Sequence, residues 1–126
     1  MPKDLVVLGD DRPAVLSRLS TACEQAGVAI EGVCAFVGEG MGTVHLLVAD
    51  DAVPLALAAL GGAGLEVRAA RDVLLVECED VPHALGEVFG RLDDARIQVQ
   101  EAYLASSSRL VVVVDDPAAA DVALQR

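Results

Sequence analysis

The sequence predicts an α+β protein in which a ferredoxin-like βαββαβ plait is built twice, the second copy lacking its last strand. Three observations lead to this fold class. A short apolar strand followed by an amphipathic helix occurs two times, strand and helix patterns alternate in the order β, α, β, β, α, β, and the two halves keep a common register.

The first strand is Leu5-Val6-Val7-Leu8, which is aliphatic and rich in β-branched residues. Pro13 fits the first turn of the helix that follows, where its missing N–H costs nothing, and Asp10 or Asp11 can cap that helix. Gly27 marks its end. The pattern therefore predicts a strand over about residues 4–9 and a helix over about 13–26.

The same strand–helix unit occurs again, with Val73–Val76 as its strand. An offset of 69 residues pairs Asp11 with Asp80 and Pro13 with Pro82. Further along the chain the offset falls to 65, because the second copy has the shorter hairpin turn. An insertion that falls in a turn while strands and helices keep their register is typical of a structural repeat.

The remaining elements follow from the same patterns. The first copy is expected to continue with strands over about residues 28–37, 43–49 and 65–70 and a helix over 52–60. The second copy is expected to have strands over about residues 72–78, 96–104 and 109–114 and helices over 82–94 and 117–125. Asp50-Asp51 and Asp115-Asp116 recur before the second helix of each copy, where capping explains them. These elements divide the chain into domains 1–70 and 71–126.

The missing fourth strand has a physical consequence for the second copy. In the plait the fourth strand flanks the first, so Val73–Cys78 would be an open aliphatic sheet edge, which invites pairing with another chain. We expect a partner subunit or the last strand of the first copy to cover this edge.

Composition excludes several classes of function. The net charge is −11, from 20 acidic and nine basic residues, without the clustered Lys and Arg that nucleic acid or anionic lipid requires. The longest uncharged run, Ala52–Leu65, has 14 residues, whereas a bilayer span needs about 20 apolar residues. The N-terminus shows no export signal. We expect a cytoplasmic protein with neither a membrane nor a nucleic-acid partner.

No motif indicates catalysis, a cofactor or a metal. The run Gly38-Glu39-Gly40-Met41-Gly42 leads into a strand rather than a helix, which favours a hairpin turn over a phosphate loop. His45 and His83 have no ligand-spaced partner. The cysteines Cys23, Cys34 and Cys78 are odd in number and form no C-x-x-C, so small buried hydrophobes in a reducing compartment are expected.

The doubled motif resembles the ACT domain, a βαββαβ module found in tandem in small amino-acid-binding proteins and allosteric regulatory regions. Family members typically read Asp-x-Pro-Gly-x-Leu, followed by Gly-(Ile/Val)-Asn-Ile. The matching residues here are Asp11-Arg12-Pro13-Ala14-Val15-Leu16 with Gly27-Val28-Ala29-Ile30, and Asp80-Val81-Pro82-His83-Ala84-Leu85 with Arg96-Ile97-Gln98-Val99.

The resemblance implies a ligand site where two modules meet, between the first strand–helix loop of one module and the start of the second strand of its neighbour. By matching position, the loop residues are Asp11, Arg12, Pro13 and Ala14 in the first copy and Asp80, Val81, Pro82 and His83 in the second, and the Asn positions are Ala29 and Gln98. Loop N–H groups at a helix N-terminus suit a carboxylate.

The motif glycine is Ala14 in one copy and His83 in the other, and of the two Asn positions only Gln98 retains an amide. The favoured site therefore combines Asp11 and Arg12 with Gln98 across the interface. Arg12 is the only cation in either loop and suits a carboxylate; a solvated surface arginine is the alternative.

Three classes of function follow. The favoured one is a regulatory module, not an enzyme, that binds an amino acid or related metabolite between its ACT-like units and forms a homodimer. The alternative is an assembly subunit without its own ligand that docks on a metabolic enzyme through its sheet edges. An enzyme on a ferredoxin-like plait is the weakest, because no loop collects a nucleophile with a base.

Overall fold

The computed structural model describes residues 2–10, 13–38 and 41–125, and these residues divide into two compact units, Met1–Asp72 (unit 1) and Val73–Arg126 (unit 2). The elements of unit 1 are β1 (Lys3–Gly9), α1 (Val15–Gln25), β2 (Gly32–Gly38), β3 (Met41–Val48), the short 3-10 turn η1 (Asp50–Ala52), α2 (Val53–Gly62) and β4 (Glu66–Asp72). Those of unit 2 are β5 (Leu74–Glu77), α3 (Val81–Asp94), β6 (Val99–Ala105), β7 (Arg109–Val114) and α4 (Pro117–Ala123).

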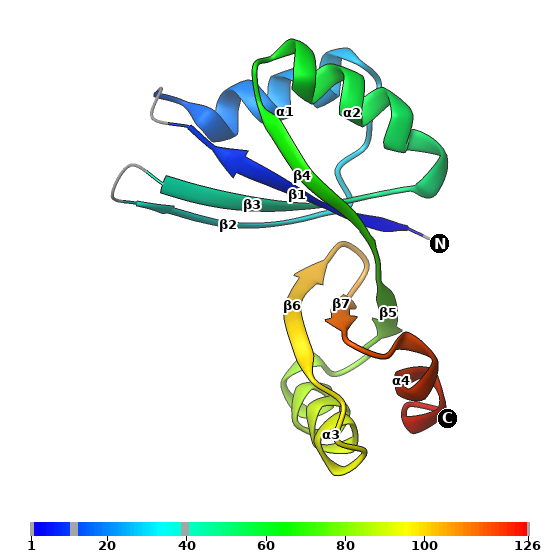
Figure 1. Cartoon of the computed structure of the whole chain (residues 1–126). Helices are drawn as coiled ribbons and strands as arrows, with labels where there is room; N and C mark the ends of the chain where they lie inside the picture. Colours follow the sequence, from blue (N-terminus) through cyan, green and yellow to red (C-terminus); the bar gives the residue numbers. More distant parts are fainter. Residues whose placement is uncertain (1, 11–12, 39–40, 126) are drawn as a thin grey trace. The chain divides into compact units, whose positions relative to one another are not determined.

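Unit 1 is an antiparallel sheet in the order β4-β1-β3-β2, with α1 and α2 on one face (Figure 1). This is the strand order of a ferredoxin-like plait. Alternate residues of β1 and β3 point toward the helices, as a period of two requires. The core that they form with the helices is aliphatic, and its fully buried members include Leu5, Leu19, Val44, Leu46 and Leu60.

Unit 2 repeats this arrangement with three strands, in the order β6-β7-β5, and it has no fourth strand among the residues that the structure describes. Its core combines one face of the strands with α3 and α4 and includes Val76, Val88, Leu92, Leu110 and Val112. The predicted α+β plait, built twice with an incomplete second copy, is confirmed.

The second strand of each copy starts later than the patterns predict, at Gly32 and Val99 rather than near residues 28 and 96. The cause is the way the preceding helices end. The N–H of Val28 donates to the Cys23 carbonyl, and the N–H of Ile97 donates to the Leu92 carbonyl, each at 2.9 Å. These amides close the helices and are therefore unavailable to the sheet.

The aspartate caps predicted for the two helices of unit 1 are not observed among the described residues. Helix α1 begins at Val15, so Pro13 precedes it, and Asp10 does not cap it; Asp11 lies outside the described residues. Helix α2 is preceded by η1, so Asp50 and Asp51 belong to a 3-10 turn instead of capping the helix.

In unit 2 the predicted cap before the second helix is present. Asp116 caps α4, because its Oδ1 accepts the Ala119 N–H at 3.0 Å. Asp115, in contrast, bonds to the segment before β6.

Asp4 is a fully buried carboxylate within unit 1 and has partners on two other strands. Its Oδ2 lies 3.1 Å from His45 Nδ1 on β3 and 3.5 Å from Arg71 Nη2 on β4. A buried charge is tolerated when it is paired and hydrogen-bonded. These contacts fix the register of the three strands in which the residues lie.

None of the helices in the described ranges has the length and apolar character needed to cross a bilayer.

Candidate ligand-binding site

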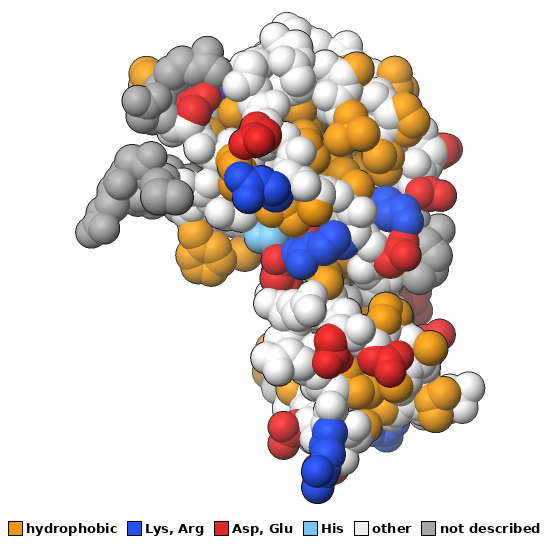
Figure 2. Space-filling view, viewed as in Figure 1, with side chains coloured by type: hydrophobic (Ala, Val, Ile, Leu, Met, Phe, Trp, Pro, Cys, Tyr) orange, Lys and Arg blue, Asp and Glu red, His pale blue; other side chains and the backbone are white. Residues whose placement is uncertain are grey.

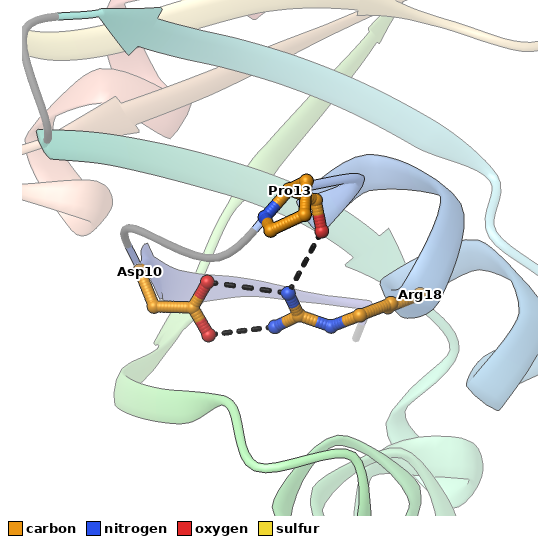
Figure 3. Close-up of polar contacts among 3 residues, drawn as sticks. All are labelled: Asp10, Pro13 and Arg18. Atoms are coloured by element: carbon orange, nitrogen blue, oxygen red, sulfur yellow. Dashed lines mark hydrogen bonds and ion pairs between the residues drawn. The ribbon is translucent and has the colours of Figure 1, made fainter.

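The β1–α1 junction of unit 1 is held by an arginine clamp (Figure 3). Arg18, in the first turns of α1, reaches back to Asp10 at the end of β1. Its Nη2 lies 2.6 Å from Asp10 Oδ2, and its Nη1 lies 3.2 Å from Asp10 Oδ1. The same Nη1 donates to the Pro13 carbonyl at 3.2 Å. A bidentate arginine–carboxylate pair fixes direction as well as distance, so the two ends of the junction are locked together.

Ala14 adopts a left-handed backbone conformation, with φ 60° and ψ 37°, at the N-cap of α1. For a residue with a Cβ this conformation costs about 1–2 kcal/mol, and glycine adopts it freely. The backbone of this chain therefore has a glycine-type turn at this position although the residue is alanine.

Arg12 and Asp11, the two residues favoured for ligand binding, lie outside the described residues. Of the loop set in unit 1, the structure places Pro13 and Ala14 together, both with exposed side chains, beside the clamp.

The matching junction of unit 2 has a different geometry. Helix α3 begins at Val81 directly after the extended N-cap Asp80, whose carbonyl accepts the Ala84 N–H at 2.8 Å. Pro82 and His83 therefore lie inside the first turn of the helix. The four predicted loop residues of this copy are contiguous, but three of them are helical, and the described part of this junction contains no left-handed residue.

Charge explains why the clamp is not repeated in unit 2. At the offset of 69 residues, Asp10 corresponds to Glu79 and Arg18 corresponds to Glu87. Two carboxylates repel each other, so no bridge can form between these positions. Glu87 instead pairs with Arg91 one turn further along α3, at 2.9 Å.

The two Asn positions also differ from the prediction, because both precede their strands. Ala29 is exposed and lies before β2, where its methyl group offers no hydrogen bond. Gln98 lies just before β6, and its backbone is held by Asp115. The Gln98 N–H donates to Asp115 Oδ1 at 3.1 Å, and the Asp115 N–H donates to the Gln98 carbonyl at 3.2 Å.

This pairing leaves the Gln98 side chain exposed at an open hollow of about 810 Å³ within unit 2, whose lining also includes Phe89, Asp93, Arg96 and Asp115. None of Asp80, Val81, Pro82 and His83 lines this hollow. Within unit 2 the structure therefore does not bring the loop set and the amide into one site.

The pairing of Asp10 with Arg18 was not predicted from the sequence. Their signal was present: an acid directly after a strand and an arginine one turn into the next helix. The prediction assigned the acid to capping instead, because capping is the commoner role of an aspartate before a helix.

The three cysteines are free thiols. Cys23 is fully buried on the core face of α1, and this burial raises the pKa of its thiol. The thiolate, which is the reactive form, is therefore disfavoured.

Several solved structures have folds similar to that of this chain. Protein BT0572 from Bacteroides thetaiotaomicron is 20% identical, with a TM-score of 0.81 over 97% of this chain and 85% of that one. The ligand-free regulatory subunit of aspartate kinase from Thermus thermophilus is 20% identical, with a TM-score of 0.75 over 98% and 87%. The corresponding subunit from Thermus flavus is 19% identical, with a TM-score of 0.69 over 97% and 89%.

No protein-family model and no curated protein matches the sequence. At identities of 20% or less the structural likeness concerns the fold, and it extends over nearly the whole chain, both copies of the motif included. The chain therefore has the tandem ACT-domain fold that its doubled motif predicts.

Proposed function

We propose that this protein is a non-catalytic regulatory module that binds an amino acid or a related small metabolite at the β1–α1 junction of unit 1. The observation that carries this proposal is the clamp from Arg18 to Asp10 and Pro13, which holds a left-handed turn at the N-terminus of α1. Such a turn presents backbone N–H groups, and the helix dipole favours an anionic group beside them.

The proposed roles follow from this geometry. Backbone N–H groups around Ala14 receive the ligand carboxylate, and Arg12 supplies a second interaction with it. Gln98 of a second copy of the chain contributes its amide and bonds a polar end of the ligand. Ala29, which has no polar side-chain atom, and the helical residues Asp80, Val81, Pro82 and His83 take a lesser part.

Two of the structural neighbours are regulatory subunits of aspartate kinase. This supports the regulatory role as well as the absence of catalytic chemistry in the chain. A reducing, cytoplasmic location fits the three free thiols.

A thermal-shift screen of the protein against the common amino acids, each at millimolar concentration, tests the proposal. A ligand at about 100 times its Kd adds about 2.7 kcal/mol to the free energy of unfolding and must raise the Tm. Arg12→Gln and Arg18→Gln should reduce the shift. Arg91→Gln, which removes a surface pair in unit 2, is the matched control and should leave the shift unchanged. Flat responses to every amino acid would contradict the proposal.

A second candidate function, docking on a metabolic enzyme, is favoured by a separate observation. On β2, which pairs with β3, Val33 is 53% exposed and Phe36 is 73% exposed. The two side chains are three residues apart and therefore lie on opposite faces of β2, and each adds exposed apolar area on its own face. Hydrophobic side chains also gather over α2 (Figure 2), where Leu55 and Leu57 are exposed.

The molecular mass of the protein in solution distinguishes a homodimer, a complex with an enzyme and a monomer. A homodimer through β2 should become monomeric in Phe36→Ser. An enzyme subunit should co-purify with an identifiable enzyme and lose it in the same variant. A monomer that retains no enzyme would exclude both forms of association.

A further inference from the structure

Among the residues that the structure describes, unit 2 has an open strand edge with a hollow beside it. Strand β5 pairs with β7 on one side and is an outer strand of the unit 2 sheet. The hollow, of about 240 Å³, lies between β5, α3 and the end of α4. Its apolar lining is Val76, Cys78, Ala84, Val88 and Leu124.

Unit 1 shows what fills the corresponding space in a complete plait. There β4 pairs antiparallel with β1, and Val67 faces Val7 in the register. Leu65 is a buried member of the unit 1 core, and Val67 packs against the same core. Because Val7 corresponds to Val76 at the offset of 69 residues, the hollow in unit 2 lies where the side chains of a fourth strand would enter.

The hollow is large enough for such side chains. An apolar cavity of about 150 Å³ accommodates a benzene molecule, and this one is larger. The strand beside it also offers backbone groups. The Cys78 N–H donates to the Ser108 carbonyl at 2.9 Å, which fixes the alternation along β5. Leu75, an odd number of residues away, therefore directs its N–H and C=O toward the open side.

Charge around this edge specifies the chemistry of its occupant. Glu77, Glu79, Asp80 and Glu87 lie along β5 and the start of α3, and Arg91, the basic residue of the hollow, is paired with Glu87. Figure 2 shows acidic side chains beside hydrophobic ones on the visible face of unit 2. A strand that docks here must bring apolar residues to the hollow and positive charge to its rim.

We propose that the β5 edge of unit 2 binds an extended segment of a partner protein, with alternating aliphatic and Lys or Arg residues, as a fourth strand. Backbone hydrogen bonds to the edge supply affinity, and the hollow with its acidic rim supplies specificity. The surface differs from the ligand site of unit 1 and does not depend on it. It is also separate from the β2 surface of unit 1 and does not depend on the enzyme-docking candidate.

The probe is a fluorescent peptide that copies residues 65–72 with lysine in place of Glu66 and Asp72. Two control peptides keep its length: one has glutamate in place of Arg68 and Arg71, and the other has proline in place of Val67. Fluorescence anisotropy with the full-length protein should show saturable binding of the basic peptide, with both controls weaker by about tenfold or more. Equal binding of the basic peptide and of the peptide with glutamate at positions 68 and 71 would overturn the proposal.

Protein variants locate the binding. Glu77→Lys with Glu79→Lys should weaken the basic peptide by about tenfold. Glu24→Lys with Asp51→Lys has the same net charge but changes exposed acids of unit 1, and it should retain the affinity of the parent protein. Comparing the two variants distinguishes binding at the β5 edge from a general attraction of the basic peptide to a protein with a net charge of −11.

Hydrogen exchange gives a readout that is independent of affinity. Peptide binding should slow exchange at the Leu75 amide, because that N–H gains an acceptor. Unchanged exchange at Leu75 would overturn the proposal. A protein dimer that the peptide dissociates would also overturn it, because a second copy of the chain would then occupy the β5 edge. Arg18→Gln should bind the peptide normally, so failure of the amino-acid screen and failure of this inference are separate results.

Discussion

The β1–α1 junction of unit 1 and the β5–α3 junction of unit 2 have matching sequence motifs but different structures. Helix α1 begins at Val15, whereas α3 begins at Val81, which corresponds to position 12 of the first copy. The proline that both copies share lies before the helix in unit 1 and inside its first turn in unit 2.

The difference arises from charge, because the proline is common to both copies. Arg18 holds Asp10 and the Pro13 carbonyl in unit 1, and the corresponding positions of unit 2, Glu79 and Glu87, repel each other. In unit 2, which has no such clamp, α3 begins at Val81, directly after its N-cap Asp80. Side-chain interactions across the junction thus decide where each helix begins.

The largest expected effect compares matching core positions on α1 and α3. Leu19→Ala should lower the free energy of unfolding by about 2–5 kcal/mol, because Leu19 is fully packed. Val88→Ala should cost about 1–2 kcal/mol, since it removes two methyl groups at about 0.8 kcal/mol each and adjoins an existing hollow. Equilibrium unfolding in urea measures both. Equal costs would contradict this account, in which the larger and more deeply buried side chain loses more.

The next effect tests the clamp. Arg18→Gln should cost about 1–3 kcal/mol, because it leaves the half-buried Asp10 carboxylate without its bidentate partner. Arg91→Gln, which breaks the exposed pair with Glu87, should cost only about 0.3–0.5 kcal/mol. Urea unfolding of the two variants side by side gives the comparison. Similar losses would mean that the clamp is an ordinary surface pair.

A smaller effect concerns the ends of the same two helices. Gly27 has φ 75° and the matching Arg96 has φ 59°, both left-handed. Gly27→Ala should cost about 1 kcal/mol from conformation alone, because no atom lies within 4 Å of the added Cβ. Arg96→Gly should stabilise unit 2 by up to about 1 kcal/mol. A change in Tm of the same sign in both variants would contradict this account.

The smallest effect is a pH dependence in unit 1. Lys3 and Asp72 face each other across β1 and β4, and their hydrogen bond raises the pKa of Lys3 and lowers the pKa of Asp72. The stability from Asp72 is present above its unfolded pKa and is lost as the pH falls through the folded one. The stability from Lys3 is lost as the pH rises through its folded pKa.

Lys3→Met should abolish the Asp72 shift, which carboxyl NMR titration measures directly. Val81→Met in unit 2, another change to methionine, should leave it unchanged. An Asp72 titration that is the same in the parent protein and in Lys3→Met would show that the pair does not form in solution.

The sequence by itself determined the doubled plait and the aliphatic core, because periodicity and register are local properties repeated over many residues. Side chains alternate between the two faces of a strand, and this alternation places residues such as Leu5 and Val76 on the core face. Prediction of the bounds was weaker, since the starts of β2 and β6 depend on which carbonyl the Val28 and Ile97 amides reach.

Only the tertiary structure decided the geometry of the candidate site. The left-handed turn at Ala14 and the clamp from Arg18 to Asp10 join residues from the end of a strand and the start of a helix, and a helix-capping rule cannot anticipate that pairing. The hollow beside β5 also could not be predicted from the sequence. In unit 1 the side chains of a fourth strand fill the corresponding space, and no such strand is present in the described part of unit 2. Patterns along a chain fix which residues are buried, whereas contacts between elements fix what those residues can bind.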